Sequence, residues 1–246
     1  MALDLNDKTS NGNNLTNNNS ATEYTTSLPF SQSTSAVAFA SASSQYLSAA
    51  DSASLDLATT GTIEFWINFA STPSSGTAFV LIAKDNQSTQ RSFSIFLRNV
   101  GGSLKLEALI LGNSTDDYYR WDWTPSTDTW YHVAVTIDTG NASATTFEAF
   151  INGVSQGNGT SVDAGNVTTI TNSTASLTIG ASGAPGEYVN GRMDDVRIWN
   201  TVRTGTQIAN NRSIELTGSE SGLVAYYPFE ASLGATAGAA FLLNFV

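Results

Sequence analysis

The residues best suited to hold a ligand lie in one short segment near the middle of the chain. Residues 116–123 combine aromatic rings with both charge signs, next to a turn at Pro125. Sugar rings stack on aromatic faces, while carboxylates and amides orient sugar hydroxyls. The segment therefore predicts a binding edge; the alternative is a strand whose aromatics close a sandwich while its polar residues face solvent. The candidate ligand-binding residues are Asp116, Asp117, Tyr118, Tyr119, Arg120, Trp121 and Trp123.

Little else in the chain supports catalysis. The sequence holds no Cys and a single His, which excludes disulfides, thiolate nucleophiles and multi-His metal centres. His132 is out of phase with the apolar residues of its segment. We interpret it as a structural histidine, because a catalytic one needs a nucleophile and an orienting carboxylate. Asp195 and Arg197 are in phase on another strand and predict a surface or semi-buried ion pair.

The charge of the chain limits its partners. Lys and Arg number 10 against 21 Asp and Glu, so the 246 residues have a net charge of −11. Nucleic acids and anionic membranes both attract basic surfaces, so neither is an expected partner. No apolar run reaches the roughly 18 residues of a membrane span, and no charged-then-apolar signal sequence begins the chain. We expect an extracellular or virion-surface location, reached after removal of a signal or by a route such as lysis that releases virus particles.

The segments that must position these residues alternate between apolar and polar positions. A period of two is typical of half-buried β-strands, and helical periodicity is nearly absent. Asn152-Gly153 predicts a hairpin turn. One short helix is predicted after Thr204, because Gln207 has the spacing of a capping box. The clearest alternating segments are 63–69, 104–110, 131–137 and 147–151.

The strands predict a single domain over residues 1–230. Turn residues separate them at the spacing of a sandwich or jelly roll, and no longer period repeats. Residues 231–246 combine a small-residue stretch with an apolar end. We predict that this tail docks on the same domain or on a neighbouring subunit.

Six segments follow one another in the order of a known family. They are residues 61–68, 129–137, 147–153, 177–182, 191–200 and 222–230. This succession resembles the laminin G-like jelly rolls of the concanavalin A-like lectin/glucanase superfamily, and its last two segments are similar to pentraxins. The resemblance implies an all-β fold, a two-sheet antiparallel β-sandwich jelly roll in which one sheet is concave.

The resemblance also bears on activity. It implies glycan or protein ligands at the concave face or rim, and a calcium ion in many members. The superfamily's glucanases carry paired carboxylates on one strand, in a Glu-x-Asp-x-x-Glu pattern. This sequence lacks such a strand, since Glu64 stands alone among Thr62, Trp66 and Asn68. We therefore predict that the protein is not an enzyme.

The N-terminal loop is similar to the family's opening loop and is a candidate calcium site. Asp7, Asn11 and Asn13 carry the oxygen atoms that Ca²⁺ prefers as ligands. Asp194 begins a late strand that runs near this loop in the fold that the resemblance implies. The alternative is a turn-rich loop whose side chains are satisfied by backbone N–H groups.

Two functions remain open. The first is a non-catalytic recognition or adhesion module of lectin type, binding glycan or another extracellular polymer at a virion or cell surface. The alternative is a structural decoration, fibre or appendage subunit, for example of a phage particle, with homo-oligomer or virion contacts. Particle size discriminates between them, because a recognition module alone is expected to be monomeric.

Overall fold

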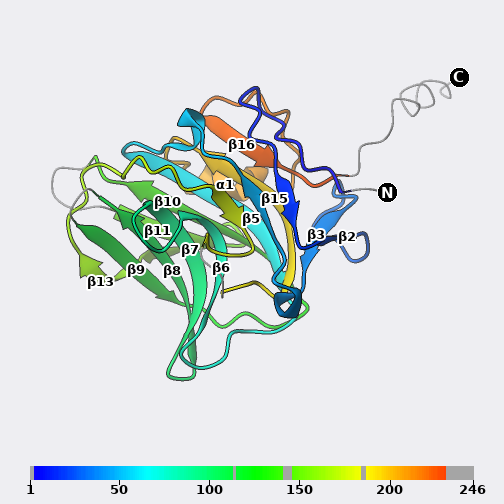
Figure 1. Ribbon diagram of the computed structural model, residues 1–246, viewed down its shortest axis with the longest axis horizontal. Helices are drawn as coiled ribbons and strands as arrows, with labels where there is room; N and C mark the ends of the chain where they lie inside the picture. Colours follow the sequence, from blue (N-terminus) through cyan, green and yellow to red (C-terminus); the bar gives the residue numbers. More distant parts are fainter. Residues whose placement is uncertain (1–2, 113–114, 141–145, 184–186, 231–246) are drawn as a thin grey trace, which may run out of the picture.

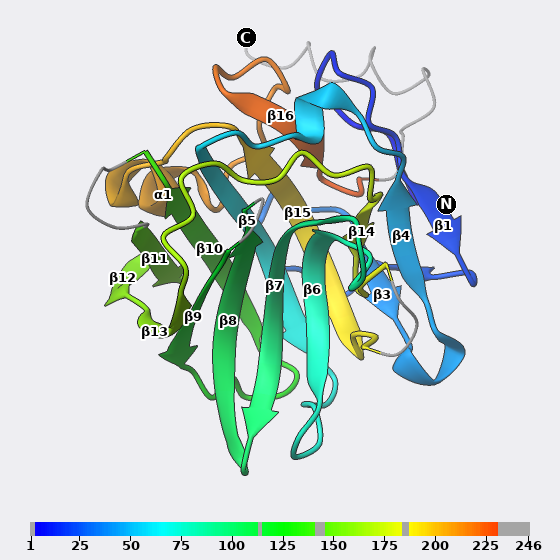
Figure 2. The ribbon, with the colours of Figure 1, turned by 60° about the vertical axis from the view of Figure 1, so that its left-hand side comes forward.

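The strands form two antiparallel sheets packed face to face (Figures 1 and 2). The computed structural model describes residues 3–112, 115–140, 146–183 and 187–230, so the predicted docking of the 231–246 tail lies outside the described residues. No helix of the described part of the chain is long and apolar enough to cross a membrane. The predicted all-β sandwich of jelly-roll type is confirmed.

Sheet A contains the segment that we predicted as a binding edge. Its strands run in the spatial order β1-β4-β14-β6-β7-β8-β9-β13. In that order they are β1 (Thr16–Asn18), β4 (Tyr46–Ala49), β14 (Leu177–Ile179), β6 (Ala78–Asp85), β7 (Arg91–Val100), β8 (Ser103–Leu111), β9 (Asp116–Asp122) and β13 (Thr160–Ala164).

Sheet B has the order β12-β11-β10-β5-β15-β3-β2, and β16 also pairs with β15. Its strands are β12 (Val154–Asn158), β11 (Thr146–Ile151), β10 (Trp130–Asp138), β5 (Thr60–Phe69), β15 (Gly191–Trp199), β3 (Ala36–Phe39), β2 (Thr22–Tyr24) and β16 (Leu223–Tyr227). Two short 3₁₀ turns, η1 (Ser41–Ser43) and η2 (Ala53–Leu55), complete the described elements together with helix α1 (Gly205–Asn211).

The core between the sheets follows from the alternation of the strands. Ile63, Phe65 and Ile67 of β5 have no exposed surface and face the other sheet. Val133 and Val135 of β10 pair with Phe65 and Ile63 across the ladder, so their side chains join the same core. The residues between these positions point to the outer faces of the sandwich. The outer faces are where polar side chains are available for a site.

Helix α1 and its flanking segment cover the outer face of sheet B. The Thr204 hydroxyl accepts a hydrogen bond from the Gln207 N–H, and the Gln207 side chain accepts one from the Thr204 N–H, which confirms the predicted capping box. Ile208 then packs on Ala134 and Phe150. This segment therefore covers part of the outer face of sheet B.

The predicted hairpin turn joins β11 and β12. Asn152 and Gly153 have φ angles of 53° and 79°, the left-handed region that the tight turn between two antiparallel strands requires. The Asn152 side chain also accepts a hydrogen bond from the His132 N–H at 2.9 Å, which ties the turn to β10.

The N-terminal loop is held against strand β16 by hydrogen bonds. Asp7 accepts from the backbone N–H groups of Thr9, Asn13 and Tyr226 at 2.9, 3.0 and 3.1 Å. The Asn11 and Asn13 side-chain amides both donate to the carbonyl of Val224. The polar loop is therefore tied to a strand more than two hundred residues later in the chain.

We expect Asp7→Ala to destabilise the protein by about 2–4 kcal/mol, because it removes several hydrogen bonds to a charged acceptor and leaves the buried Tyr226 N–H unpaired. Urea unfolding at neutral pH measures the loss. Asp163→Ala, at an exposed carboxylate of β13, is the matched control and is expected to stay close to the wild type. Equal free energies of unfolding for the two variants would contradict the bracing role of Asp7.

Candidate functional site

The outer face of sheet A carries a patch of polar and aromatic side chains from three neighbouring strands. The ladder pairs Phe96 with Glu107 and Glu107 with Arg120. One step along the strands, Lys105 lies between Arg98 and Asp122. Leu97, Leu106 and Trp121, which alternate with these paired residues along the strands, belong to the core. The side chains of the paired residues therefore point outward. We call this patch the outer grid; it comprises Ser94, Phe96, Arg98, Lys105, Glu107, Leu109, Tyr118, Arg120 and Asp122.

Glu107 is the centre of the outer grid and has no exposed surface. Its Oε2 atom lies 2.9 Å from Arg98 Nε, and its Oε1 atom lies 2.7 Å from Arg120 Nη2. The Tyr118 hydroxyl donates a hydrogen bond to Oε2. Burial works against the charged form of Arg98, but Glu107 outweighs it and raises the pKa of Arg98. The buried carboxylate thus binds two cationic side chains from the strands on either side.

Both guanidinium groups also lie over aromatic rings of the outer grid. Arg98 is 5.0 Å from the centroid of Phe96, and Arg120 is 5.6 Å from that of Tyr118. The two rings are themselves 5.9 Å apart. Ion pairing and cation–π contact together fix the orientation of the guanidinium groups.

A cavity of about 420 Å³ opens beside the outer grid, at the edge where β9 meets β13 and β12. This volume lies within the range of pockets that bind small ligands. Charged groups and amides dominate its lining, which suits a ligand that is rich in hydroxyl groups. The lining residues are Lys105, Arg120, Trp121, Asp122, Gln156, Asn158 and Thr160.

The structure divides the predicted 116–123 segment between the two faces of β9. Tyr118 and Arg120 lie on the outer grid, and Asp116 is half-buried at the start of the strand. Asp117 points inward and accepts hydrogen bonds from two backbone N–H groups, of Asn166 and Val167. The remaining aromatics have packing partners as well, which is the behaviour of a strand that closes the sandwich.

Three aromatic residues of this segment pack into the interior. Tyr119 lies against Phe147 with ring centroids 4.7 Å apart. Trp121 is 5% exposed and donates its indole N–H to the Gly157 carbonyl, so only its edge reaches the cavity. Trp123 packs edge-on against Phe69 and Tyr131.

Several residues of the site were not among the sequence-predicted candidates. Lys105 and Glu107 alternate with apolar residues in β8, and the period of two alone places them on an outer face. Arg98 carried no such signal, because its role depends on the register between β7 and β8. Gln156 and Asn158 lie in an exposed polar strand that the sequence pattern does not distinguish from a loop.

A second cavity of about 350 Å³ lies at the opposite edge of sheet A. Hydroxyls and amides line it, among them those of Tyr46, Asn86 and Gln90. No charged side chain lines this cavity among the residues that the structure describes. The two cavities therefore differ in charge, although both lie along sheet A.

The candidate calcium ligands are engaged elsewhere in the described structure. The Asp7 carboxylate accepts hydrogen bonds from backbone N–H groups, the arrangement that we gave as the alternative to a metal site. Asp194 accepts from the Ser33 hydroxyl at 2.6 Å and from the Asp195 N–H at 2.7 Å. The described residues hold no group of three or more acidic or histidine side chains that could share a metal ion. These contacts give no support to calcium at Asp7, Asn11, Asn13 and Asp194, and the site stays a prediction.

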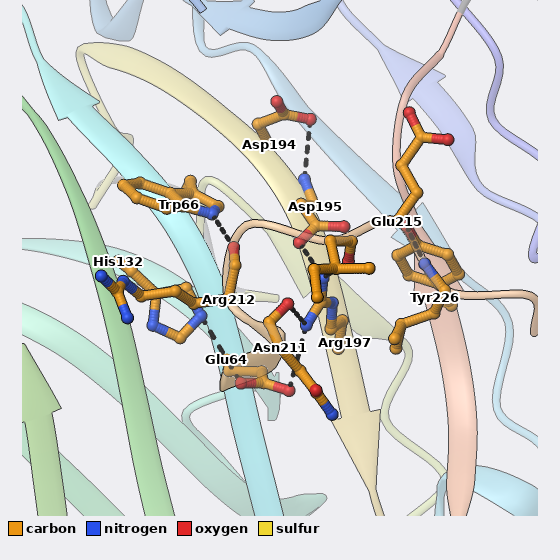
Figure 3. A network of polar contacts seen from close by, with 12 residues as sticks. Glu64, Trp66, His132, Asp194, Asp195, Arg197, Asn211, Arg212, Glu215 and Tyr226 are labelled. Carbon is orange, nitrogen blue, oxygen red and sulfur yellow. Dashed lines mark hydrogen bonds and ion pairs between the residues drawn. The ribbon is translucent and has the colours of Figure 1, made fainter. Parts of the chain in front are cut away.

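A separate polar network lies on the outer face of sheet B, beneath α1 and the segment that follows it (Figure 3). Glu64 and His132 face each other with 3.5 Å between Oε2 and Nε2, and Trp199 donates its indole N–H to Glu64 Oε1 at 2.8 Å. Arg197 donates to the carbonyls of Asn211 and Ile214 and lies 2.5 Å from Asp195. Asp195 and Arg197 form the predicted ion pair, but the pair is buried and not at or near the surface as expected, because α1 and the segment after it cover this face.

His132 is a structural residue, as predicted. It has no exposed surface, and neither does Glu64, so a substrate reaches neither side chain in this structure. Burial lowers the pKa of His132 despite the facing Glu64, so the imidazole is neutral at pH 7. The network holds the covering segment onto the sheet.

Comparison with known proteins identifies the family. The family model of the concanavalin A-like lectin/glucanases superfamily matches residues 41–209. The chain belongs to this superfamily. No curated protein matches the sequence.

Several solved structures share the superfamily fold at low sequence identity. Domain 4 of AbnA, an extracellular arabinanase from Geobacillus stearothermophilus solved with arabinotriose, is 20% identical with a TM-score of 0.59. The match covers 84% of this chain and 92% of that one. The enzymatically active domain of tailspike protein 2 from bacteriophage CBA120 is 13% identical with a TM-score of 0.61, covering 95% of this chain and 34% of that one.

The predicted likeness to pentraxins is also found. The native heptameric SAP-like pentraxin of Limulus polyphemus is 18% identical with a TM-score of 0.50. The match covers 72% of this chain and 80% of that chain. At these identities the comparisons establish a common fold.

Two adjacent buried carboxyls, Asp194 and Asp195, lie in the middle of β15. Burial, and then the neighbouring Asp195, raises the pKa of Asp194 well above its usual range. Burial raises the pKa of Asp195 to about 7, although Arg197 works in the opposite direction. Each pKa is higher in the folded protein than the value of 3.8 of a free side chain. The contribution of the protonated Asp195 to the free energy of unfolding is complete below a pH of 3.8 and is lost as the pH rises through about 7.

We expect the Asp194→Asn variant to gain stability relative to the wild type as the pH rises from acid to neutral, because the amide cannot lose a proton. The expected gain is up to about 1.4 kcal/mol for each pH unit in that window. Chemical unfolding of both proteins at a series of pH values measures the difference. Asp128→Asn, at a carboxylate that is 71% exposed, is the control. A difference between Asp194→Asn and wild type that does not change with pH would exclude a titrating Asp194.

Proposed function

We propose that this chain is a non-catalytic recognition module that binds a glycan or another extracellular polymer on the outer face of sheet A. The observation that carries the proposal is the cavity of about 420 Å³ beside the outer grid. Its lining offers the donors and acceptors that orient sugar hydroxyls, from Arg120, Asp122 and Asn158 among others. The Trp121 edge adds an apolar surface.

The superfamily relationship supports a binding role. The AbnA domain, solved with arabinotriose, shares the fold over most of both chains. Fold alone does not determine function, so the ligand must be argued from the site. In the outer grid, the polar groups are held in position by ion pairs, and their order before binding lowers the entropic cost of holding a ligand.

The geometry favours binding over glycoside hydrolysis. A hydrolase of this type needs one carboxylate as an acid and a second as a base or nucleophile across the scissile bond. Glu107, the buried carboxylate of the outer grid, is bound on both oxygens by Arg98, Arg120 and Tyr118. These contacts occupy Glu107, and within the described residues no second carboxylate of the outer grid faces it across the cavity in the way a hydrolase requires.

An extracellular or virion-surface location fits this function. The solved structures that share the fold include a domain of an extracellular arabinanase and a domain of a phage tailspike protein. The tailspike likeness covers 95% of this chain and favours a second candidate, a decoration or fibre subunit that uses the jelly roll for assembly. The two roles are compatible in one protein.

A glycan array, run in calcium and again in EDTA, tests the binding proposal. We expect binding to a restricted set of glycans, and a loss of about tenfold in Asn158→Ala, because one hydrogen bond to the ligand is removed. Gln90→Ala, in the second cavity, is the matched control. A loss in Gln90→Ala alone would move the site to that cavity. Loss of binding in EDTA would support the predicted calcium ion.

Particle size tests the assembly role. We expect the purified chain to be monomeric in light scattering coupled to size exclusion if recognition is its whole function. A defined oligomer, together with silence on the array, would favour the structural subunit over the recognition module.

A further inference from the structure

We infer that the ligand of the outer grid is an acidic glycan, whose anionic groups bind the cationic side chains Arg98, Lys105 and Arg120. The inference rests on the proposed function and gives it a substrate class. It is carried by three features of the outer grid: where its charges lie, which of them are exposed, and what covers its aromatic rings.

Three cationic side chains of this acidic protein lie together on the outer grid. The chain has ten Lys and Arg residues against a net charge of −11. Three of these ten lie together on one patch, where Glu107 and Asp122 are the facing carboxylates, so the outer grid has one positive charge in excess. By contrast, Lys84 and Arg197 have no exposed surface and are bound by buried or half-buried acids. An anion that contacts the outer grid therefore meets more cationic than anionic side chains.

The cations around Glu107 are more exposed than the carboxylate that holds them, and the exposed carboxylate of the outer grid is Asp122, at 87%. The Glu107 side chain is 0% exposed, whereas the Arg98 and Arg120 side chains are 33% and 27% exposed. The carboxylate lies behind the guanidinium groups and holds them, while their outer edges are presented to solvent. A ligand carboxylate or sulfate thus meets donors before it meets the buried negative charge.

Donor capacity remains on these guanidinium groups. Each guanidinium carries five N–H donors in a planar fork. Glu107 accepts from Nε of Arg98 and lies against Nη2 of Arg120. Planar forks of this kind bind carboxylate and sulfate groups with paired hydrogen bonds.

The aromatic rings of the outer grid favour an ionic ligand over a neutral sugar. A neutral sugar ring stacks on an open aromatic face. Here the guanidinium groups lie over Phe96 and Tyr118, at 5.0 and 5.6 Å from the ring centroids. Phe96 is also only 5% exposed. The surface presented to a ligand is consequently cationic.

Matched polysaccharides test the inference. Polygalacturonate, alginate, hyaluronan and chondroitin sulfate are compared with neutral arabinan and galactan, and polygalacturonate also with its carboxyl-reduced form. We expect binding of at least one acidic polymer, a loss of about tenfold or more on carboxyl reduction, and further weakening as sodium chloride is raised. Titration calorimetry measures each pair.

Variants connect that binding to the outer grid. Arg120→Gln and Lys105→Gln are each expected to weaken the acidic polymer by about tenfold. Lys105 is paired with the exposed Asp122 and not with Glu107, so its variant keeps the buried ion pair and the fold. Arg192→Gln is the matched control, an exposed arginine on sheet B that lies over Tyr24. Circular dichroism confirms folding of every variant.

The outcomes separate this inference from the proposed function. Equal affinity for polygalacturonate and its carboxyl-reduced form, or binding of neutral glycans alone, would overturn the acidic ligand and leave glycan recognition intact. Acidic binding that is unchanged in Arg120→Gln and Lys105→Gln would also overturn the assignment to the outer grid. Silence with every polymer and on the glycan array would overturn both proposals.

Discussion

The candidate site depends on one buried carboxylate. An isolated Glu107 without exposed surface would cost several kcal/mol of desolvation, so its neighbours must compensate the charge. Arg98 and Arg120 do so from the two adjoining strands, and each is anchored at one end by the same residue. The ordering of these long side chains is therefore part of folding, and a ligand meets cations whose positions are already set.

Each outer face of the sandwich has a buried glutamate beside an arginine, but the two faces use this pair for different purposes. On sheet B, Glu64 also lies beside an arginine, with 3.7 Å between its Oε1 and Nη1 of Arg197. There the segment of α1 covers the pair, and Arg197 donates to two carbonyls of that segment. On sheet A the arginines beside Glu107, Arg98 and Arg120, remain partly exposed. The exposure of the arginine thus separates a contact that holds two segments of the protein together from a contact that a ligand can make.

Much of the fold could be predicted from local sequence patterns. The alternation in residues 63–69 and 131–137 predicts strands because side chains of a strand point alternately to two faces, and Thr204 with Gln207 predicts a helix start from a contact across three residues. Trp66 and Trp199, which lie in two of the segments that resemble the family, are both buried.

The candidate site was only partly predictable, because it depends on which residues face each other across strands. The ladder places Glu107 opposite both Phe96 and Arg120, and no local pattern encodes that register. The acids of β15 illustrate the same limit. A bulge with a φ of 51° at Asp195 interrupts the alternation there, so Asp194 and Asp195 are both buried although they are neighbours in sequence.

The contact between the N-terminal loop and β16 has a consequence for the architecture in which such a domain can be used. The Lys8 N–H donates to the Tyr226 carbonyl at 3.0 Å, next to the bond between the Tyr226 N–H and Asp7. The segment at which the chain enters the sandwich and the strand at which it leaves therefore lie side by side. A domain whose two ends are adjacent can be inserted into a surface loop of a host protein without separating the two ends of that loop. In such a fusion the unit projects as a side branch.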